Sequence, residues 1–305
     1  MSEILVGIDG SEGAQDALAF AQRLAGPAGA SLRLASVFRY SDMPSRVYDK
    51  EWRETLRDEA QVMLDRAAAS AEGVPVATDA LANMSPPHAL HSLAEEVGAA
   101  MVVVGSTHRG PVGRVLPGST AERLLHGSPC PVAIVPHGYA ARGAGPIKTV
   151  AAAYNGSDES AAAVAAACRM ARRFGAALRV IRVFDATHVG APALMTVPGY
   201  VVANPDYEAE QREGLERAVA ALPDDVRAEA VFVAGSAATE LAAQSADVDL
   251  MVVGSRGYGP LAAVLLGGLT HALVRKAACP LVVLPRGEHA GIDALFAAAE
   301  TTAAR

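Results

Sequence analysis

Apolar residues in the first half of the chain follow two alternating patterns. Short continuous apolar runs are typical of strands covered on both faces, whereas apolar residues at three- and four-residue steps are typical of amphipathic helices. The short runs predict strands over residues 4–8, 32–38, 74–81, 101–104 and 132–135. The stretches between these runs predict helices, so strands and helices alternate along the chain.

The predicted helices have recognisable starts, faces and ends. Ser11 offers an N-cap for an alanine-rich helix, which we expect to end near the Gly26-Pro27 break. Proline is tolerated in the first turn of a helix, so Ser85-Pro86-Pro87 predicts the start of a helix that runs to residue 97. The helix predicted over residues 49–71 has an apolar face that we expect to be buried, formed by Trp52, Leu56, Ala60, Met63, Leu64 and Ala67.

The second half of the chain repeats the first. Residues 102–136 and 251–285 align without a gap, and each copy has the form strand, glycine loop, helix, strand, with the first of these helices predicted over residues 119–125. Upstream, residues 6–37 have a counterpart that ends at Val183. A repeat of this length indicates two equivalent units, each near the usual size of one domain.

We therefore expect two domains and a tail. The first domain is predicted over residues 1–140, the second over 147–286, and the tail over 287–305 as a short amphipathic helix. In the second unit, the stretch 185–205 is punctuated by Gly and Pro and replaces a shorter connection of the first unit. We interpret that stretch as a surface loop.

The order of the elements indicates the fold class. Strands that alternate with helices favour a parallel sheet with helices on both faces. We expect an α/β protein with two tandem doubly wound, mostly parallel five-stranded sheets. The last strand of each unit, PVAIVP and PLVVLP, is apolar and fenced by prolines. Such a strand left unpaired at a sheet edge would invite aggregation, and the two copies can cover each other.

Composition and charge exclude several classes of protein. With 305 residues, 51% of them apolar, the chain can bury two cores, yet no run reaches the roughly 18 apolar residues of a membrane span. The start, MSEILVGIDGS, lacks the features of a secretory signal, so we expect a cytoplasmic protein with no membrane partner.

A net charge of −7 without a basic stripe argues against nucleic acid as a partner. Among the three cysteines, Cys130 and Cys279 are expected to fill equivalent packing positions.

Two glycine-rich loops carry the candidate chemistry. Each follows a buried strand at the C-terminal edge of the predicted sheet, where open α/β sheets bind ligands. Glycines let backbone N–H groups approach a phosphate, and a helix N-terminus favours negative charge. Arg109 and Arg114 in the first loop and Arg256 in the second offer guanidinium groups for phosphate oxygens. The alternative interpretation is that these arginines are solvated loop residues.

With these loops the chain resembles a tandem universal stress protein, and the resemblance covers both halves of the sequence. The nucleotide-binding loop of that family is G-x-x-G-x(9)-G-[ST]. In the second half, Gly254, Gly257 and Gly267 match its three glycines. Gly268 stands where the motif has a hydroxyl residue, and Thr270 is the nearest hydroxyl.

The first loop departs from the motif at a different position. Gly105, Gly118 and Ser119 match it, whereas His108 replaces the second glycine and Gly110 lies nearby. We interpret His108 as sealing the loop against a neighbouring helix, with a role facing the phosphates as the alternative. Each half therefore keeps three of the four fixed positions.

The resemblance also implies contacts away from the loops. The family has an acidic residue near the base and ribose, which corresponds to Asp9 and, in the second half, to Asn155. A valine whose backbone meets adenine corresponds to Val37 and Val183. Because an amide carbonyl still accepts hydrogen bonds, Asn155 weakens a site more than it abolishes it. The predicted nucleotide contacts are Asp9, Val37, Gly105, Arg109, Gly110, Gly118, Ser119, Thr120, Asn155, Val183, Gly254, Arg256, Gly257, Gly267, Gly268 and Thr270.

The resemblance implies a stress-related protein that binds ATP, or AMP or ADP, with or without Mg²⁺. The nucleotide is expected to stabilise or switch the fold rather than to react. The chain has no Ser-His-Asp order, no metal-ligand spacing and no P-loop lysine, so we predict no enzyme beyond slow incidental ATP hydrolysis. Two alternatives stay open: a homologue that has lost nucleotide binding and acts as a dimeric scaffold, and a weak adenine-nucleotide hydrolase.

The resemblance also implies how the two units are arranged. Members with one such domain commonly dimerise through the last strand. The tandem chain is therefore expected to form that pair internally, as an intramolecular pseudodimer. Whether two chains associate further into a homodimer is left open.

Overall fold

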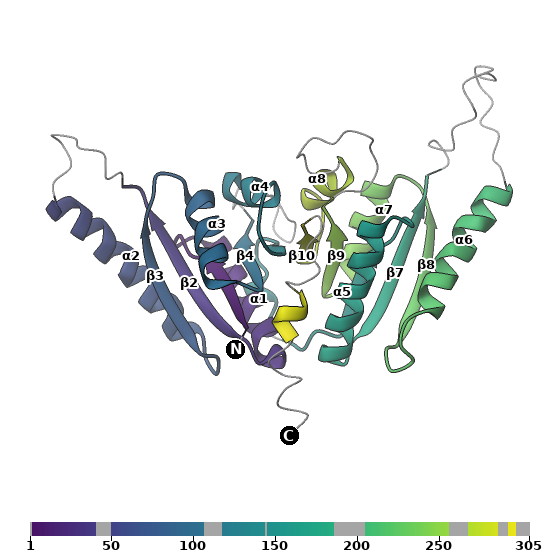
Figure 1. The fold of residues 1–305 in the computed structure, drawn as a ribbon, viewed down its shortest axis with the longest axis horizontal. Helices are drawn as coiled ribbons and strands as arrows, with labels where there is room; N and C mark the ends of the chain where they lie inside the picture. Colours follow the sequence, from purple (N-terminus) through teal and green to yellow (C-terminus); the bar gives the residue numbers. More distant parts are fainter. Residues whose placement is uncertain are drawn as a thin grey trace, which may run out of the picture.

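The structure is a computed structural model that describes residues 2–40, 50–106, 118–143, 145–185, 205–255, 268–285 and 292–296 (Figure 1). The strands of the first half are β1 (Glu3–Gly7), β2 (Ser31–Phe38), β3 (Val76–Ala82), β4 (Met101–Gly105) and β5 (Val132–Val135). Its helices are α1 (Glu12–Ala28), α2 (Lys50–Ser70), α3 (Pro86–Val97) and α4 (Ser119–Leu125), followed by the short 3₁₀ turn η1 (Ala140–Arg142).

The second half repeats this order. Its strands are β6 (Thr149–Ala153), β7 (Ala177–Phe184), β8 (Ala228–Ala234), β9 (Leu250–Gly254) and β10 (Leu281–Leu284). Its helices are α5 (Asp158–Phe174), α6 (Pro205–Ala220), α7 (Ala237–Gln244) and α8 (Gly268–Val274), with the 3₁₀ turn η3 (Ser245–Asp247) after α7. Residues 292–296 form one further helical turn.

The ten strands form one continuous sheet in the order β3-β2-β1-β4-β5-β10-β9-β6-β7-β8. Within each half the paired strands are parallel. The halves join where β5 and β10 pair antiparallel, with Ala133 opposite Val282. The predicted fold class is confirmed, and the pairing of β5 with β10 places the two units as an intramolecular pseudodimer.

Helices cover both faces of the sheet. One core cluster takes side chains of α1, α2, α5 and α6, while a second takes those of α3, α4, α7 and α8. Successive residues of β1 alternate between the two clusters, since Ile4 and Val6 join the first and Leu5 the second. Continuous apolar strands are therefore required, because each side of the sheet is buried. Among the described residues, no helix has both the length and the apolar character needed to cross a membrane.

The first helix ends close to the predicted Gly26-Pro27 break. Gly26 and Pro27 lie inside α1, which ends at Ala28. Gly29 adopts a left-handed conformation with φ of 64°, and its N–H bonds back to the carbonyls of Ala25 and Gly26. A glycine in this conformation is a common helix terminator, and it ends α1 more effectively than a proline in the last turn.

The predicted buried face of α2 is also only partly correct. Ala60 and Leu64 are buried, but Trp52 is 51% exposed. None of residues 50–59 is buried, because the helix packs on the outermost strands and its first half extends past them, at one end of the molecule (Figure 1). The pattern of apolar residues predicted the helix correctly, but it did not predict how much of the helix packs against the sheet.

A polar cluster connects α1 to the segment between the halves and to the second half. The carboxylate of Asp16, which is buried, accepts hydrogen bonds from the backbone N–H groups of Gly138 (2.8 Å) and Ala140 (2.7 Å). Arg23 donates to the hydroxyl of Tyr139 and lies 3.5 Å from Asp249 of the second half. Burial raises the pKa of the Tyr139 phenol, and the nearby Arg23 cation partly offsets that rise.

The two ends of the described chain meet beside this junction. Ile292, Leu295 and Phe296 of the last helical turn are buried. The Ser2 hydroxyl donates to the carbonyl of Leu295 at 2.9 Å. The ring of Phe296 meets that of Phe174 in α5 edge to face, with 6.1 Å between centroids. The last turn therefore packs against both halves, between α1 and α5 (Figure 1).

Candidate functional site

A cleft opens at the C-terminal edge of the sheet in the first half, where β1 and β4 lie side by side. The chain leaves β1 toward β2 on one side and returns through β4 on the other, and open α/β sheets bind ligands at such switch points. The cavity has a volume of about 350 Å³, which is in the range of small-molecule sites. Its described lining includes six of the predicted contacts: Asp9, Val37, Gly105, Gly118, Ser119 and Thr120.

Asp9 follows β1 and is exposed at the mouth of this cleft. Its Oδ1 accepts hydrogen bonds from the backbone N–H of Ser11 (3.0 Å) and from the Ser11 hydroxyl (2.5 Å), and Ser11 in turn caps α1. Its Oδ2 makes no hydrogen bond with another described residue, so this oxygen is available to accept from a ligand. The same carboxylate thus orders the entry to α1 and offers an acceptor to the cleft.

One wall of the first cleft is apolar. It is formed by Ala35 and Val37 of β2, and by Pro86 and Leu90 of α3. A flat apolar ligand group fits such a wall, and Arg39 at the rim adds a cation. Sequence reasoning missed Arg39, although its place two residues after Val37, directly after the end of β2, was a usable signal.

Ser119 and Thr120 bring hydroxyl groups to the opposite side of the cleft. They begin α4, and both line the cavity. Gly118 precedes them with extended backbone (φ −79°, ψ 171°), so its conformation does not require glycine. The two hydroxyls can donate to an anionic ligand group, which the predicted phosphate contacts require.

Gly105 has a structural reason to be glycine. A Cβ built at Gly105 would lie 1.9 Å from the carbonyl oxygen of Gly13 in α1, and one built at Gly13 would lie 2.4 Å from the carbonyl of Ser106. The end of β4 and the start of α1 therefore touch through backbone alone. The glycine that the motif assigns to phosphate approach is needed for this helix–strand contact in any case.

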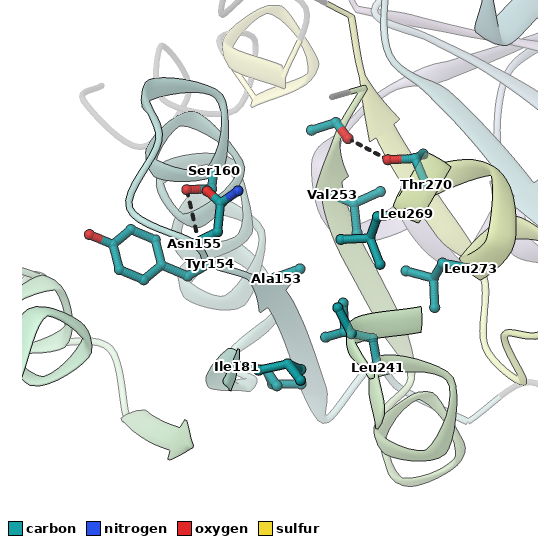
Figure 2. A pocket seen from close by; sticks show the side chains of 13 residues that line it. Ala153, Tyr154, Asn155, Ser160, Ile181, Leu241, Val253, Leu269, Thr270 and Leu273 are labelled. Atoms are coloured by element: carbon teal, nitrogen blue, oxygen red, sulfur yellow. Dashed lines mark hydrogen bonds between the residues drawn. The ribbon is translucent and has the colours of Figure 1, made fainter. Parts of the chain in front are cut away.

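The second half has a far smaller cavity at the equivalent place (Figure 2). Its volume is about 40 Å³, enough for little more than one water molecule. The predicted contacts Asn155, Val183, Gly254 and Thr270 line it, whereas Gly268 begins α8 outside the described lining. Figure 2 shows apolar side chains around this small cavity, among them Ile181, Leu241, Val253 and Leu269.

Asn155 takes the same structural part in the second half as Asp9 in the first. Its Oδ1 accepts from the backbone N–H of Ser157 at 2.9 Å, and Ser157 caps α5. Its own N–H donates to the hydroxyl of Ser160 at 3.2 Å (Figure 2). Asp and Asn both form this turn, so the exchange preserves the local backbone and removes only the charge.

The sequence predicts that the Thr270 hydroxyl is available to a ligand, but the structure shows it bonded within the protein. The side chain is buried, and its Oγ1 donates to the carbonyl of Gly254 at 3.0 Å (Figure 2). Its hydroxyl proton is thus bonded to the end of β9. A Cβ at Gly254 would lie 3.2 Å from its nearest neighbours, which is a much weaker demand for glycine than at Gly105.

Several predicted contacts cannot be placed. Arg109, Gly110, Arg256, Gly257 and Gly267 lie outside the described residues, as do His108, Arg114 and most of the stretch 185–205. Cys130 and Cys279, by contrast, are buried as predicted, and burial raises the pKa of the Cys279 thiol far above its usual range. Both cysteines belong to the core, and the Cys279 thiol is held in its protonated form.

Within the part of the chain that the structure describes, no three His, Cys, Asp or Glu side chains gather as a metal-binding group. The described lining of the first cleft contains one carboxylate, Asp9, and several hydroxyls. Such a set suits an ion that is held mainly by phosphate oxygens, as Mg²⁺ commonly is. The described lining therefore does not hold Mg²⁺ by itself and is compatible with an ion whose ligands are mainly phosphate oxygens.

Comparison with known proteins identifies the family. The sequence profile of the Universal stress protein family matches residues 1–136 and 146–285. The chain is 31% identical over 293 residues to Universal stress protein Rv2319c of Mycobacterium tuberculosis, covering 92% of this chain and 99% of that protein. It is 28% identical over 294 residues to Universal stress protein Rv2005c of the same organism, covering 92% and 96%.

Solved structures agree on the fold. A universal stress protein from Archaeoglobus fulgidus superposes with a TM-score of 0.67 at 19% identity, covering 94% of this chain and 97% of that one. A Pseudomonas aeruginosa protein described as functionally unknown superposes with a TM-score of 0.63 at 20% identity, covering 99% and 98%. With two family matches that together span most of its length, the chain belongs to the universal stress protein family, as a tandem member with two such domains.

Proposed function

We propose that this protein binds an adenine nucleotide, ATP or one of its products, as a ligand that stabilises or switches the fold. The observation that carries the proposal is the first cleft, a cavity of about 350 Å³ at the switch point of the sheet. It brings together Asp9, Val37 and Ser119, which come from three separate parts of the sequence. Family membership adds support, because the resemblance assigns nucleotide contacts to these three positions.

The chemistry of the cleft matches the parts of a nucleotide. The apolar wall of Ala35, Val37 and Leu90 suits a purine ring, while the carboxylate of Asp9 accepts from ribose hydroxyls. Across the cleft, the hydroxyls of Ser119 and Thr120 donate to phosphate oxygens. A ligand held between β1, β2, α3 and α4 binds only the folded chain. At a hundred times its Kd it therefore adds about 2.7 kcal/mol to the free energy of unfolding.

We propose a binding role rather than a catalytic one. The described lining of the first cleft contains no histidine, and the Oδ1 of its one carboxylate is bonded to Ser11. Activating a water molecule requires a base with a free acceptor near the scissile phosphate. ATP hydrolysis at this cleft is therefore expected to be slow and incidental. The cytoplasmic location and the association into homodimers stay predictions.

Calorimetric titration of nucleotide-stripped protein with ATP, with and without Mg²⁺, tests the proposal. The informative variant is Asp9→Asn, because Asn155 shows that an asparagine forms the same turn before the helix. Replacing a charged acceptor by a neutral one should weaken binding about tenfold. Asp58→Asn, on the exposed side of α2, is the matched control. No heat and no shift of the unfolding temperature at millimolar ATP would contradict nucleotide binding.

A second candidate function is that of an interaction scaffold without nucleotide. The small cavity of the second half, about 40 Å³, favours it, because that half has no room for a nucleotide. The scaffold interpretation requires the first cleft to be empty in the purified protein as well. Nucleotide that stays bound through purification, released by denaturation and identified by chromatography, would exclude it.

A further inference from the structure

We infer that the chain holds one nucleotide, in the first half, and that side chains of the second half have closed the equivalent site. This inference rests on the proposed function and names the half that performs it. The volumes of the two cavities, about 350 Å³ and about 40 Å³, carry the inference. The first volume accommodates a drug-sized ligand, whereas the second accommodates a water molecule.

The difference in volume has identifiable causes. At four equivalent lining positions of the repeat, the second half has the larger side chain: Ala153 for Gly7, Ile181 for Ala35, Leu269 for Thr120 and Thr270 for Ala121. These residues belong to three elements, β6, β7 and α8, and all four line the same cavity. Positions that do not differ, such as Val37 and Val183 or Leu90 and Leu241, form the shared frame of the two cavities.

The enlarged side chains have become part of the core. Ile181 has no exposed surface, and it belongs with Leu241, Val253 and Leu273 to the core cluster of that side of the sheet. Opening this space for a ligand would separate close-packed apolar side chains, whose interior packing leaves few voids. The site is closed by stable contacts between side chains, which a nucleotide would have to displace.

Among the described residues, the second half also has fewer polar groups that could bind an anionic ligand. Ser119 and Thr120 line the first cleft, whereas Gly268 and Leu269 stand at these positions in the second half, and the hydroxyl of Thr270 is bonded to Gly254. The position of Arg39 at the rim of the first cleft is occupied by Asp185 in the second half. A carboxylate in place of a guanidinium reverses the local charge and disfavours an anionic ligand. Shape and charge therefore both assign the nucleotide to the first half.

Stoichiometry is the first test. Calorimetric titration of the nucleotide-stripped full chain with ATP should give one site per chain. Two sites per chain would overturn the inference and leave the proposed function intact. Absence of binding would overturn the proposed function itself, so the two failures are distinguishable.

Exchange of one residue between the clefts is the second test. Ala35→Ile installs the second-half residue in the first cleft and should weaken ATP binding at least tenfold, about 1.4 kcal/mol. Ile181→Ala, the reverse exchange, should leave the affinity and the stoichiometry unchanged. Any other pattern overturns the inference, including a loss of affinity in Ile181→Ala or none in Ala35→Ile.

A folding control keeps this test decisive. Ala35 is buried, so the circular dichroism and the cooperative thermal unfolding of Ala35→Ile must first match those of the unaltered protein. If that variant does not fold, Ala121→Thr takes its place, because Thr270 shows that a threonine fits the position. Ala121→Thr should likewise weaken binding at least tenfold, and unchanged affinity in this variant would overturn the inference.

Discussion

The seam between the halves and the two clefts differ in how closely the copies still match. At the seam, VAIV of β5 faces LVVL of β10, and every residue of both strands is buried. At the clefts, glycine and alanine of the first copy are replaced by alanine, isoleucine and threonine at the equivalent positions of the second. The same duplication has therefore kept one region equivalent and let another diverge.

The difference follows from what each region packs against. At the seam each copy is the packing partner of the other. A substitution in β5 therefore changes the contacts of β10. The described lining of each cleft comes from its own half. A substitution there leaves the other copy undisturbed, and one half can lose its cavity while the other keeps it.

The largest effect is expected at the seam. Val282 is fully buried and lies opposite Ala133 across the seam. Val282→Asp would bury a carboxylate without a partner and should lower the free energy of unfolding by more than about 4 kcal/mol. Urea unfolding followed by circular dichroism measures the change. Val62→Asp, at a position of α2 that is 48% exposed, is the control and should be nearly neutral.

The anchor of α1 should give the next largest effect. Asp16→Ala leaves the N–H groups of Gly138 and Ala140 without their acceptor, which should cost about 2–3 kcal/mol of stability. The corresponding residue of α5 is Ala162, so the second half offers no equivalent bond. Asp58→Ala on the exposed side of α2 is the control. Equal unfolding curves for Asp16→Ala and the control would show that the anchor contributes nothing.

A pair of glycine substitutions compares the two clefts directly. Gly105→Ala pushes a methyl group into the backbone of α1, whereas Gly254→Ala meets atoms at 3.2 Å. Gly105→Ala should therefore lose about 1–3 kcal/mol of stability and Gly254→Ala less than about 1 kcal/mol. Thermal unfolding of both variants checks the order. The reverse order would mean that the contact of strand with helix is looser in the first half than in the second.

The smallest expected effect is a pH dependence at the junction. The pKa of Tyr139 is raised in the folded chain, chiefly because the phenol is buried. Its protonated form thus contributes stability that is fully present below the ordinary pKa of 10.0 and is lost as the pH rises through the higher folded value. Tyr139→Phe should flatten the alkaline decline in urea unfolding between pH 8 and 11. Tyr207→Phe, at an exposed tyrosine, should not.

Much of the fold was predictable because burial on both faces leaves a clear pattern. The apolar runs at β4 and β5 located those strands within a residue, and the repeat located their counterparts. The error at α2 arose where a local rule depends on distant structure. The helical period places Trp52 on the apolar face, yet its side chain is exposed, because burial also requires a neighbouring element to pack against.

The candidate site was predicted less completely. Motif positions pointed to Asp9, Val37 and Ser119, and the fold brings them to one cavity. The closing of the second cleft was not predictable from any single motif. Ile181, Leu269 and Thr270 are ordinary apolar or buried positions until the fold places them around one space. Pairing each residue with its repeat partner would have revealed the trend at four lining positions, where Ala153, Ile181, Leu269 and Thr270 replace Gly7, Ala35, Thr120 and Ala121.

The hydrogen bond between Ser2 and Leu295 has a consequence for the topology of the chain. Because the two ends of the described chain lie side by side at the junction, the polypeptide is nearly a closed ring. Which half comes first in the sequence then depends only on where the chain begins. The strand order of the sheet would be the same in either case. A chain that begins with the second half and joins its former ends by a short linker has the same neighbours at every strand. Circular permutation is therefore compatible with this fold.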